Sequence, residues 1–102
     1  AEVEEVRSLS ERGETRLIDV RGPEEYRAGH VPGAVNIPLA ELDQAGDRLP
    51  ADHEAPVITV CNRGNMSLNG LLVLKSLGYR NVRSLNGGTT AWVEQGNPVE
   101  SE

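Results

Sequence analysis

The stretch from Val57 to Ser67 constrains the fold of this chain more than any other. It opens with the β-branched run Val57–Val60, which is typical of a strand buried on both faces. A tight loop follows, and its first residue, Cys61, is the only cysteine in the chain. A helical pattern then begins at Ser67, the expected N-cap, and carries apolar residues as far as Leu77. This order of strand, loop and helix predicts an α/β unit whose loop lies at the carboxyl edge of a parallel sheet.

The rest of the 102-residue chain alternates between strand-like and helix-like patterns. We expect further strands at residues 16–20, 34–37 and 82–85. We expect helices at residues 4–11, from residue 22 until Gly29, at 39–42 and at 89–94, with Gly13 and Gly78 ending the helices that precede them. Residues 43–56 are polar and contain Gly and Pro, which predicts a surface connection. The pattern predicts a single domain over residues 1–102, with a mostly parallel sheet, right-handed crossovers and helices on both faces.

Composition narrows the range of functions. The net charge is −6, with 16 acidic and 10 basic residues, so we expect neither nucleic acid nor an anionic membrane as a partner. No apolar run is long enough to span a bilayer, and we see no secretory leader. A single cysteine forms no internal disulfide, and a reactive thiol suits a reducing compartment, so we expect a cytoplasmic location. The spacing of His30, His53 and Cys61 is not that of metal ligands, and we expect no metal and no cofactor.

The position of Cys61 suggests a nucleophile. A loop that turns into a helix start directs several backbone N–H groups at one point, and the helix dipole adds positive potential there. A thiol in such a place loses its proton more easily than an ordinary cysteine. The alternative, an inert buried cysteine, fits less well at a strand-end loop with Gly64 close behind. The ends of two other strands, at residues 19–21 and 86–88, are expected to surround the same cleft.

Four segments of the chain resemble the rhodanese family of sulfurtransferases, and they occur in the family's order. They are Leu17-Ile18-Asp19-Val20-Arg21; Glu25-Tyr26 with Gly29-His30-Val31-Pro32-Gly33-Ala34-Val35-Asn36-Ile37-Pro38; the Cys61 loop; and Leu85-Asn86-Gly87-Gly88 with Ala91-Trp92. The resemblance implies the rhodanese-like three-layer fold, with a mostly parallel five-stranded sheet and helices on both faces. Its first strand would fall before or at residues 1–3.

The resemblance also implies a reaction. Cys61 would take the outer sulfur of a donor, thiosulfate or a persulfide, and pass it from a Cys61 persulfide to a thiophilic acceptor such as cyanide, a thiol or a protein. This is a double displacement on a covalent intermediate. The substrate would be bound by the loop residues, whose amides stabilise an anionic sulfur, and Asp19 and Arg21 would support the loop. We expect a monomer. The loop residues concerned are Asn62, Arg63, Gly64, Asn65, Met66 and Ser67.

The loop departs from the family pattern at its last position. Met66 stands where the family usually has Arg, and Met does not form the forked hydrogen bonds by which Arg holds an oxyanion. Arg63 is the one cation in the loop, and it is open whether it binds a substrate anion or is solvated. Asn69 and Gly70 replace small apolar residues, which is expected to loosen the first turn of the helix.

Other residues have structural roles as the simpler interpretation. We expect Asp19 and Arg21 to form structural hydrogen bonds and a salt bridge with a neighbour such as Glu24 or Glu25. His30 is predicted to be a hydrogen-bonded turn residue, and Trp92 to pack the closing helix. The glycines at 87 and 88 would let the backbone approach the cleft, although a plain turn requires the same residues.

Two other functions compete with sulfur transfer. A phosphatase or arsenate reductase of the cysteine-loop type needs a longer loop closed by Arg, whereas this loop has six residues from Cys61 to Met66. A noncatalytic rhodanese-like module that binds or regulates a partner is supported by Met66 and opposed by the retained Cys61.

Overall fold

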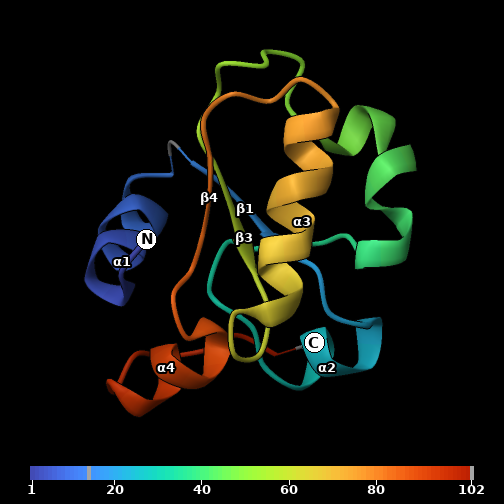
Figure 1. Cartoon of the computed structure of the whole chain (residues 1–102). Coiled ribbons are helices and arrows are strands. Elements are labelled where there is room, and N and C mark those ends of the chain that lie inside the picture. Colours follow the sequence, from blue (N-terminus) through green and yellow to red (C-terminus); the bar gives the residue numbers. More distant parts are fainter. Residues whose placement is uncertain (14, 102) are drawn as a thin grey trace.

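The protein is an α/β structure built on a parallel sheet (Figure 1). It is a computed structural model that describes residues 1–13 and 15–101. The sheet of the described residues has the strand order β2-β1-β3-β4, and each neighbouring pair is parallel. The strands are β1 (Arg16–Asp19), β2 (Val35–Asn36), β3 (Val57–Val60) and β4 (Val82–Ser84). All four fall where the sequence predicts them, and the predicted fold class is confirmed.

Helices cover both faces of the sheet, as Figure 1 shows for α1 and α4 on one side and α3 on the other. The α-helices are α1 (Val3–Arg12), α2 (Pro23–Ala28), α3 (Asn65–Ser76) and α4 (Gly88–Glu94), and the 3₁₀ helices are η1 (Leu39–Gln44) and η2 (Gly46–Arg48). Within the described residues, no helix combines the length and the apolar composition that crossing a bilayer requires.

Two hydrophobic cores form because successive strand residues point to opposite faces of the sheet. Val57 of β3 lies in the core under α3, with Leu74 and Ile18. Ile58, the next residue, lies in the core on the other face, with Val6 of α1 and Trp92 of α4. Trp92 is 2% exposed, which confirms its predicted packing role. The apolar run of β3 is therefore buried on both sides, as its composition predicts.

The sheet has four strands in the described residues, so the five implied by the resemblance are wrong in number. The Ala1 amino group donates to Ser84 O at 2.7 Å, and Asn86 N donates to Ala1 O at 2.8 Å. A single residue therefore extends the sheet beside β4. The chain then enters α1 at Val3.

The start of α3 also differs from the prediction. The helix begins at Asn65, and its N-cap is Gly64 with φ of 102°. Ser67, the predicted N-cap, lies at the third position inside the helix and is fully buried. The sequence misled because glycine caps a helix with its backbone alone, whereas Ser is the commoner cap.

Gly70 of α3, which the sequence predicts to loosen the first turn, lies against the sheet. A Cβ at this position would lie 3.2 Å from Val20 Cγ1 and 3.5 Å from Thr59 Cγ2. The absence of a side chain thus lets the helix backbone approach β1 and β3 closely. The predicted surface connection at 43–56 is also more ordered than expected, because it includes η2 and the buried Leu49.

The turn between β4 and α4 packs directly against the loop that follows β3. Gly88 has φ of 61°, and a Cβ on it would lie 2.4 Å from Cys61 O and 2.6 Å from Asn62 O. Both contacts are with backbone atoms, which cannot rotate away. The close approach predicted for this glycine is therefore present.

We expect Gly88→Ala to lower the free energy of unfolding by about 3 kcal/mol or more, because it adds an atomic overlap to the backbone strain. Gly96→Ala is the matched control, since Gly96 has φ of 81° but nothing within 4 Å of its Cβ position. That variant should lose only about 1 kcal/mol. Urea denaturation measures both, and equal losses would contradict the packing argument.

Candidate active site

Cys61 lies at the carboxyl end of β3, in a loop that closes around its sulfur. The residue is 2% exposed, and Gly64 N donates a hydrogen bond to Cys61 Sγ at 2.9 Å. The predicted loop residues on either side are exposed, apart from the half-buried Gly64 and the buried Ser67. Cys61 also belongs to the apolar core cluster that includes Val20 and Leu74, so the residue is buried between this core and the backbone of its own loop.

The backbone of α4 determines which way the loop amides point. Thr89 N donates to Cys61 O at 2.7 Å, and Thr90 N donates to Asn62 O at 2.9 Å. In a trans peptide the C=O and the following N–H point in opposite directions. Because the carbonyls of Cys61 and Asn62 face α4, the amides of Asn62 and Arg63 face the other way. The amide of Gly64 donates to the sulfur, and those of Arg63 and Ser67 act on the same thiol as further stabilising donors.

These donors change the acidity of the thiol. Burial raises the pKa of Cys61, because a thiolate loses hydration there. The Ser67 hydroxyl and the amides of Ser67, Gly64 and Arg63 stabilise the thiolate, and together they lower the pKa below the ordinary value of a cysteine. The Ser67 hydroxyl also lies 3.1 Å from Gly64 O. Its single hydrogen can turn to the sulfur when the thiolate forms.

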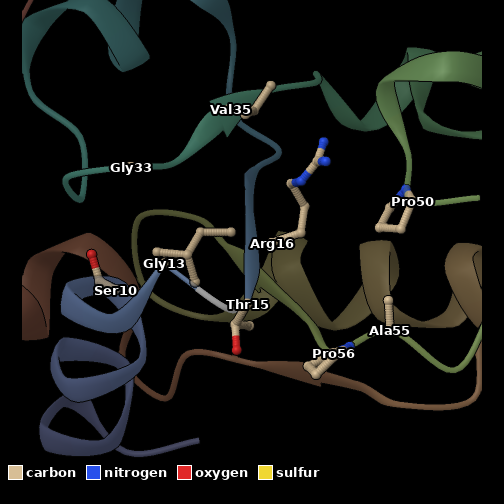
Figure 2. A pocket seen from close by; sticks show the side chains of 10 residues that line it. Ser10, Gly13, Thr15, Arg16, Gly33, Val35, Pro50, Ala55 and Pro56 are labelled. Atoms are coloured by element: carbon tan, nitrogen blue, oxygen red, sulfur yellow. The ribbon is translucent and has the colours of Figure 1, made fainter. Parts of the chain in front are cut away.

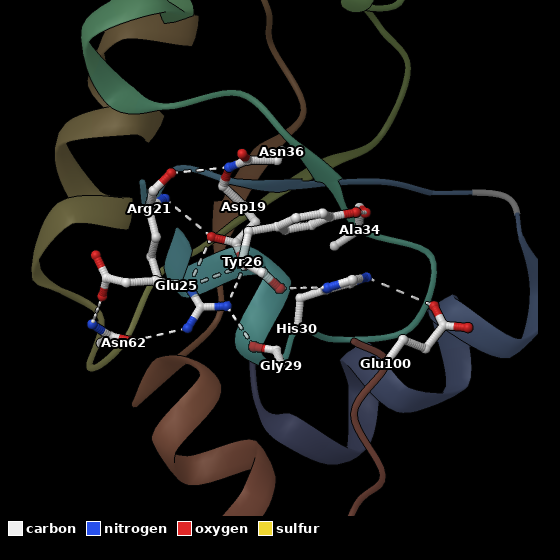
Figure 3. A network of polar contacts seen from close by, with 10 residues as sticks. All are labelled: Asp19, Arg21, Glu25, Tyr26, Gly29, His30, Ala34, Asn36, Asn62 and Glu100. Atoms are coloured by element: carbon white, nitrogen blue, oxygen red, sulfur yellow. Dashed lines mark hydrogen bonds and ion pairs between the residues drawn. The ribbon is translucent and has the colours of Figure 1, made fainter. Parts of the chain in front are cut away.

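A buried ion pair holds the loop from the side of β1 (Figure 3). Arg21 Nη2 lies 2.8 Å from Asp19 Oδ2, and neither side chain is more than 5% exposed. Arg21 Nη1 donates to Asn62 Oδ1 at 3.0 Å, and Asn62 Nδ2 donates to Glu25 Oε2 at 2.6 Å. The predicted structural role of the pair matches this geometry. The predicted salt bridge to Glu24 or Glu25 is wrong, since a buried Asp19 two residues away is nearer to the guanidinium than an exposed glutamate.

Arg63 and Met66 lie on the outside of the loop. Arg63 lines a shallow cavity of about 190 Å³ together with Leu68, Asn86 and Gly87. It forms no ion pair with the described residues. Met66 is 40% exposed. The structure thus brings the six loop residues together around Cys61 but directs the one cation of the loop toward the β4 side.

The histidines lie apart from the sulfur. His30 is buried, its Nδ1 lies 2.7 Å from Tyr26 O, and its ring stacks on Tyr26 at 3.7 Å. It is hydrogen-bonded as predicted, but it lies in an isolated antiparallel bridge with Glu100 and not in the turn, which falls at Pro32 and Gly33. The described part of the chain contains no cluster of three His, Cys, Asp or Glu side chains that could hold a metal ion.

A cavity of about 340 Å³ lies at the opposite edge of the sheet (Figure 2). Its wall includes Arg16 and Leu17 at the start of β1, and Pro56 just before β3. These residues mark the amino ends of the strands, whereas Cys61 follows the carboxyl end of β3. This cavity is therefore no part of the candidate site.

Two contributions to the site were missed in the sequence. One is the pair of α4 amides at Thr89 and Thr90, and the other is the Asn62 side chain that connects Arg21 to Glu25. The glycine pair at 87 and 88 was the available signal for the first. The second had no signal, because a loop asparagine is compatible with many partners.

The structure combines a parallel sheet flanked by helices with a cysteine of lowered pKa in the loop that follows a strand. This combination defines a cysteine-loop protein of the α/β class, as the sequence predicts. The sequence-family model for the rhodanese-like domain matches residues 2–95 of this chain. The chain therefore belongs to the rhodanese family. It is an enzyme of the rhodanese sulfurtransferase type.

Individual relatives agree with this assignment. The human thiosulfate:glutathione sulfurtransferase is 36% identical over 89% of this chain and 90% of its own length. The structure titled human single-domain sulfurtransferase TSTD1 has a TM-score of 0.84 at 34% identity, covering 93% of this chain and 95% of that one. The adenylyltransferase and sulfurtransferase uba4 of Ogataea parapolymorpha is 38% identical over 91% of this chain, which spans only 24% of that protein.

We expect the alkylation rate of Cys61 by iodoacetamide to rise with pH at a midpoint below that of a free cysteine, because its pKa is lowered. Ser67→Ala should move the midpoint upward, since it removes a donor that favours the thiolate. The control is Ser76→Ala, whose exposed hydroxyl donates to Val73 O at the far end of α3. An unmoved midpoint in Ser67→Ala would show that the amides alone set the pKa. As the only cysteine, Cys61 accounts for all the alkylation.

Proposed function

We propose that Cys61 carries sulfur between a donor and a thiophilic acceptor. The observation that supports this most is the Gly64 amide that donates to the Cys61 sulfur at 2.9 Å, in a loop whose donors lower the thiol pKa. In the first step the Cys61 thiolate attacks the outer sulfur of the donor, and the rest of the donor leaves, as sulfite when the donor is thiosulfate. In the second step the acceptor attacks the terminal sulfur of the Cys61 persulfide and releases the Cys61 thiolate. No oxidant or reductant is consumed.

The same loop would hold the persulfide. A persulfide is anionic at its terminal sulfur, and amides that stabilise a thiolate also stabilise this charge. The proposed binding groups are the loop residues Asn62, Arg63, Gly64, Asn65, Met66 and Ser67. Asp19 and Arg21 support them through Asn62. Thiolate exchange needs no general base, because the attacking and leaving groups are both good sulfur anions.

The human relative is named for thiosulfate and glutathione, which supports these compounds as donor and acceptor here. The exposed Met66 argues for a weaker hold on thiosulfate, since the loop lacks a forked donor at that position. A small persulfide needs no such donor. We therefore propose thiosulfate or a persulfide as donor, and cyanide, a thiol or a protein as acceptor. A single domain over residues 1–102, acting as a monomer in the cytoplasm, is part of the same proposal.

The direct test is mass spectrometry after incubation with thiosulfate, 3-mercaptopyruvate or glutathione persulfide. We expect a gain of about 32 Da, one sulfur atom, on the peptide that contains Cys61. Subsequent cyanide should remove the added mass and release thiocyanate. Cys61→Ser is the control and should gain nothing. A protein left unmodified by every donor would refute the proposal.

The donor preference has a separate test. Met66→Arg should raise kcat/KM for thiosulfate about tenfold, because a hydrogen bond to a charged group contributes about 1.5 kcal/mol or more. Met66→Gln is the matched control, since it is similar in size but carries no charge. Steady-state thiocyanate formation measures the rates. If the Arg variant were no faster than the Gln variant, the missing cation would not be the limit on thiosulfate use.

A further inference from the structure

Acidic and basic residues are unevenly distributed along the sequence. No acidic residue occurs between Glu54 and Glu94, whereas Arg63, Lys75, Arg80 and Arg83 lie in that interval. All 16 acidic residues and the other six basic ones lie outside it. The interval contains the Cys61 loop and the whole of α3. The segment that carries the candidate nucleophile is therefore cationic in a protein that is acidic as a whole.

Two of the four cations are neutralised by neighbours. Arg80 forms an ion pair with Glu54 at 3.0 Å, and Arg83 contacts Glu5. Arg63 and Lys75 form no ion pair with the described residues. These two free cations lie at opposite ends of α3, one just before the helix and one in its last turn.

Apolar side chains are exposed between these two cations. Leu68 is 53% exposed and Leu72 is 62% exposed. Residues four apart lie on the same side of a helix, one turn from each other. The buried residues of α3, which are Ser67, Gly70 and Leu74, mark the side that faces the sheet. Arg63, Leu68, Leu72 and Lys75 thus form an outward surface, which we call the α3 face.

The α3 face is continuous with the candidate site. Leu68 and Arg63 share the cavity of about 190 Å³ beside Gly64, whose amide donates to the Cys61 sulfur. Figure 1 shows the β3–α3 loop at one end of α3, with the outer side of the helix clear of the sheet. A molecule seated on this face would reach the loop with its nearest end.

We propose that the α3 face docks an acceptor protein that presents a cysteine next to apolar and acidic side chains. This inference depends on the proposed function and deepens it by naming the acceptor class. Acidic groups would pair with Arg63 and Lys75, and apolar groups would cover Leu68 and Leu72. The partner's thiolate attacks the terminal sulfur of the Cys61 persulfide. A bond forms between that sulfur and the partner, the bond to Cys61 Sγ breaks, and Cys61 leaves as a thiolate.

Two synthetic acceptor peptides test the proposal. Each contains one cysteine and leucines, and they differ only in carrying glutamates or lysines around the cysteine. The persulfide form of the whole protein is prepared first, and transfer is followed by mass spectrometry. The acidic peptide should have a kcat/KM about tenfold above that of the basic peptide at low salt, and the difference should shrink at high salt.

Matched variants locate the effect. Lys75→Glu should remove the preference for the acidic peptide, whereas Arg12→Glu, which changes a basic residue in the last turn of α1, should keep it. Leu72→Gln should slow transfer to both leucine-containing peptides, and Val93→Gln, at an exposed valine of α4, should not. Transfer to cyanide should be unchanged in all four variants, because none of these residues belongs to the loop.

The outcomes separate the two proposals. Equal rates for the two peptides in the unmodified protein would overturn the docking proposal while leaving sulfur transfer intact. A dimer in sedimentation experiments that is lost in Leu72→Gln would also overturn it, because a second copy would then occupy the face. If no persulfide forms and cyanide receives no sulfur, the proposed function fails, and the docking proposal fails with it.

Discussion

The chemistry of the site depends on two hydrogen bonds that do not touch the sulfur. Thr89 and Thr90 bind the carbonyls of Cys61 and Asn62, and peptide geometry then turns the amides of Asn62 and Arg63 away from α4. The arrangement requires the β4–α4 turn to lie against the loop, which only a residue without Cβ permits at position 88. A helix on one face of the sheet thus orients donors for a sulfur on the other face. The site is a property of the whole fold, because no single segment contains both halves of this contact.

The ion pair of Asp19 and Arg21 complements this arrangement because it occupies the Arg21 guanidinium with partners other than the sulfur. Arg21 is neutralised by Asp19 and uses its remaining donors on Asn62 and Gly29. The thiolate is therefore stabilised mainly by a hydroxyl and amide dipoles. Nucleophilicity falls as the pKa of a thiol falls, so a modest stabilisation keeps the sulfur reactive both as attacking and as leaving group. A sulfur carrier needs both properties in one cycle.

Much of this could be read from the sequence, and the failures have physical causes. The strand at Val57–Val60 and the cleft of three strand ends followed from β-branched composition and from the rules of parallel sheets. Ser67 was misplaced because a glycine cap leaves only a weak pattern. The partner of Arg21 was misjudged because burial of Asp19 appears only in three dimensions. The apolar positions of α3 indicated a helix correctly, but Leu68 and Leu72 were not separable from core residues by spacing alone.

The net charge of −6 opposes the approach of anions at long range, whereas local geometry favours them at the site. The molecule measures 34 × 26 × 22 Å, which is several times the screening length of about 8 Å at physiological ionic strength. All 16 acidic residues lie outside the segment between Glu54 and Glu94 that carries the loop. Two that approach the loop, Glu2 and Glu25, already accept hydrogen bonds from Asn86 and Asn62. An anion near Cys61 can interact directly with the Gly64 amide and with the cations of an acid-free segment, and the more distant acidic residues act mainly at low salt.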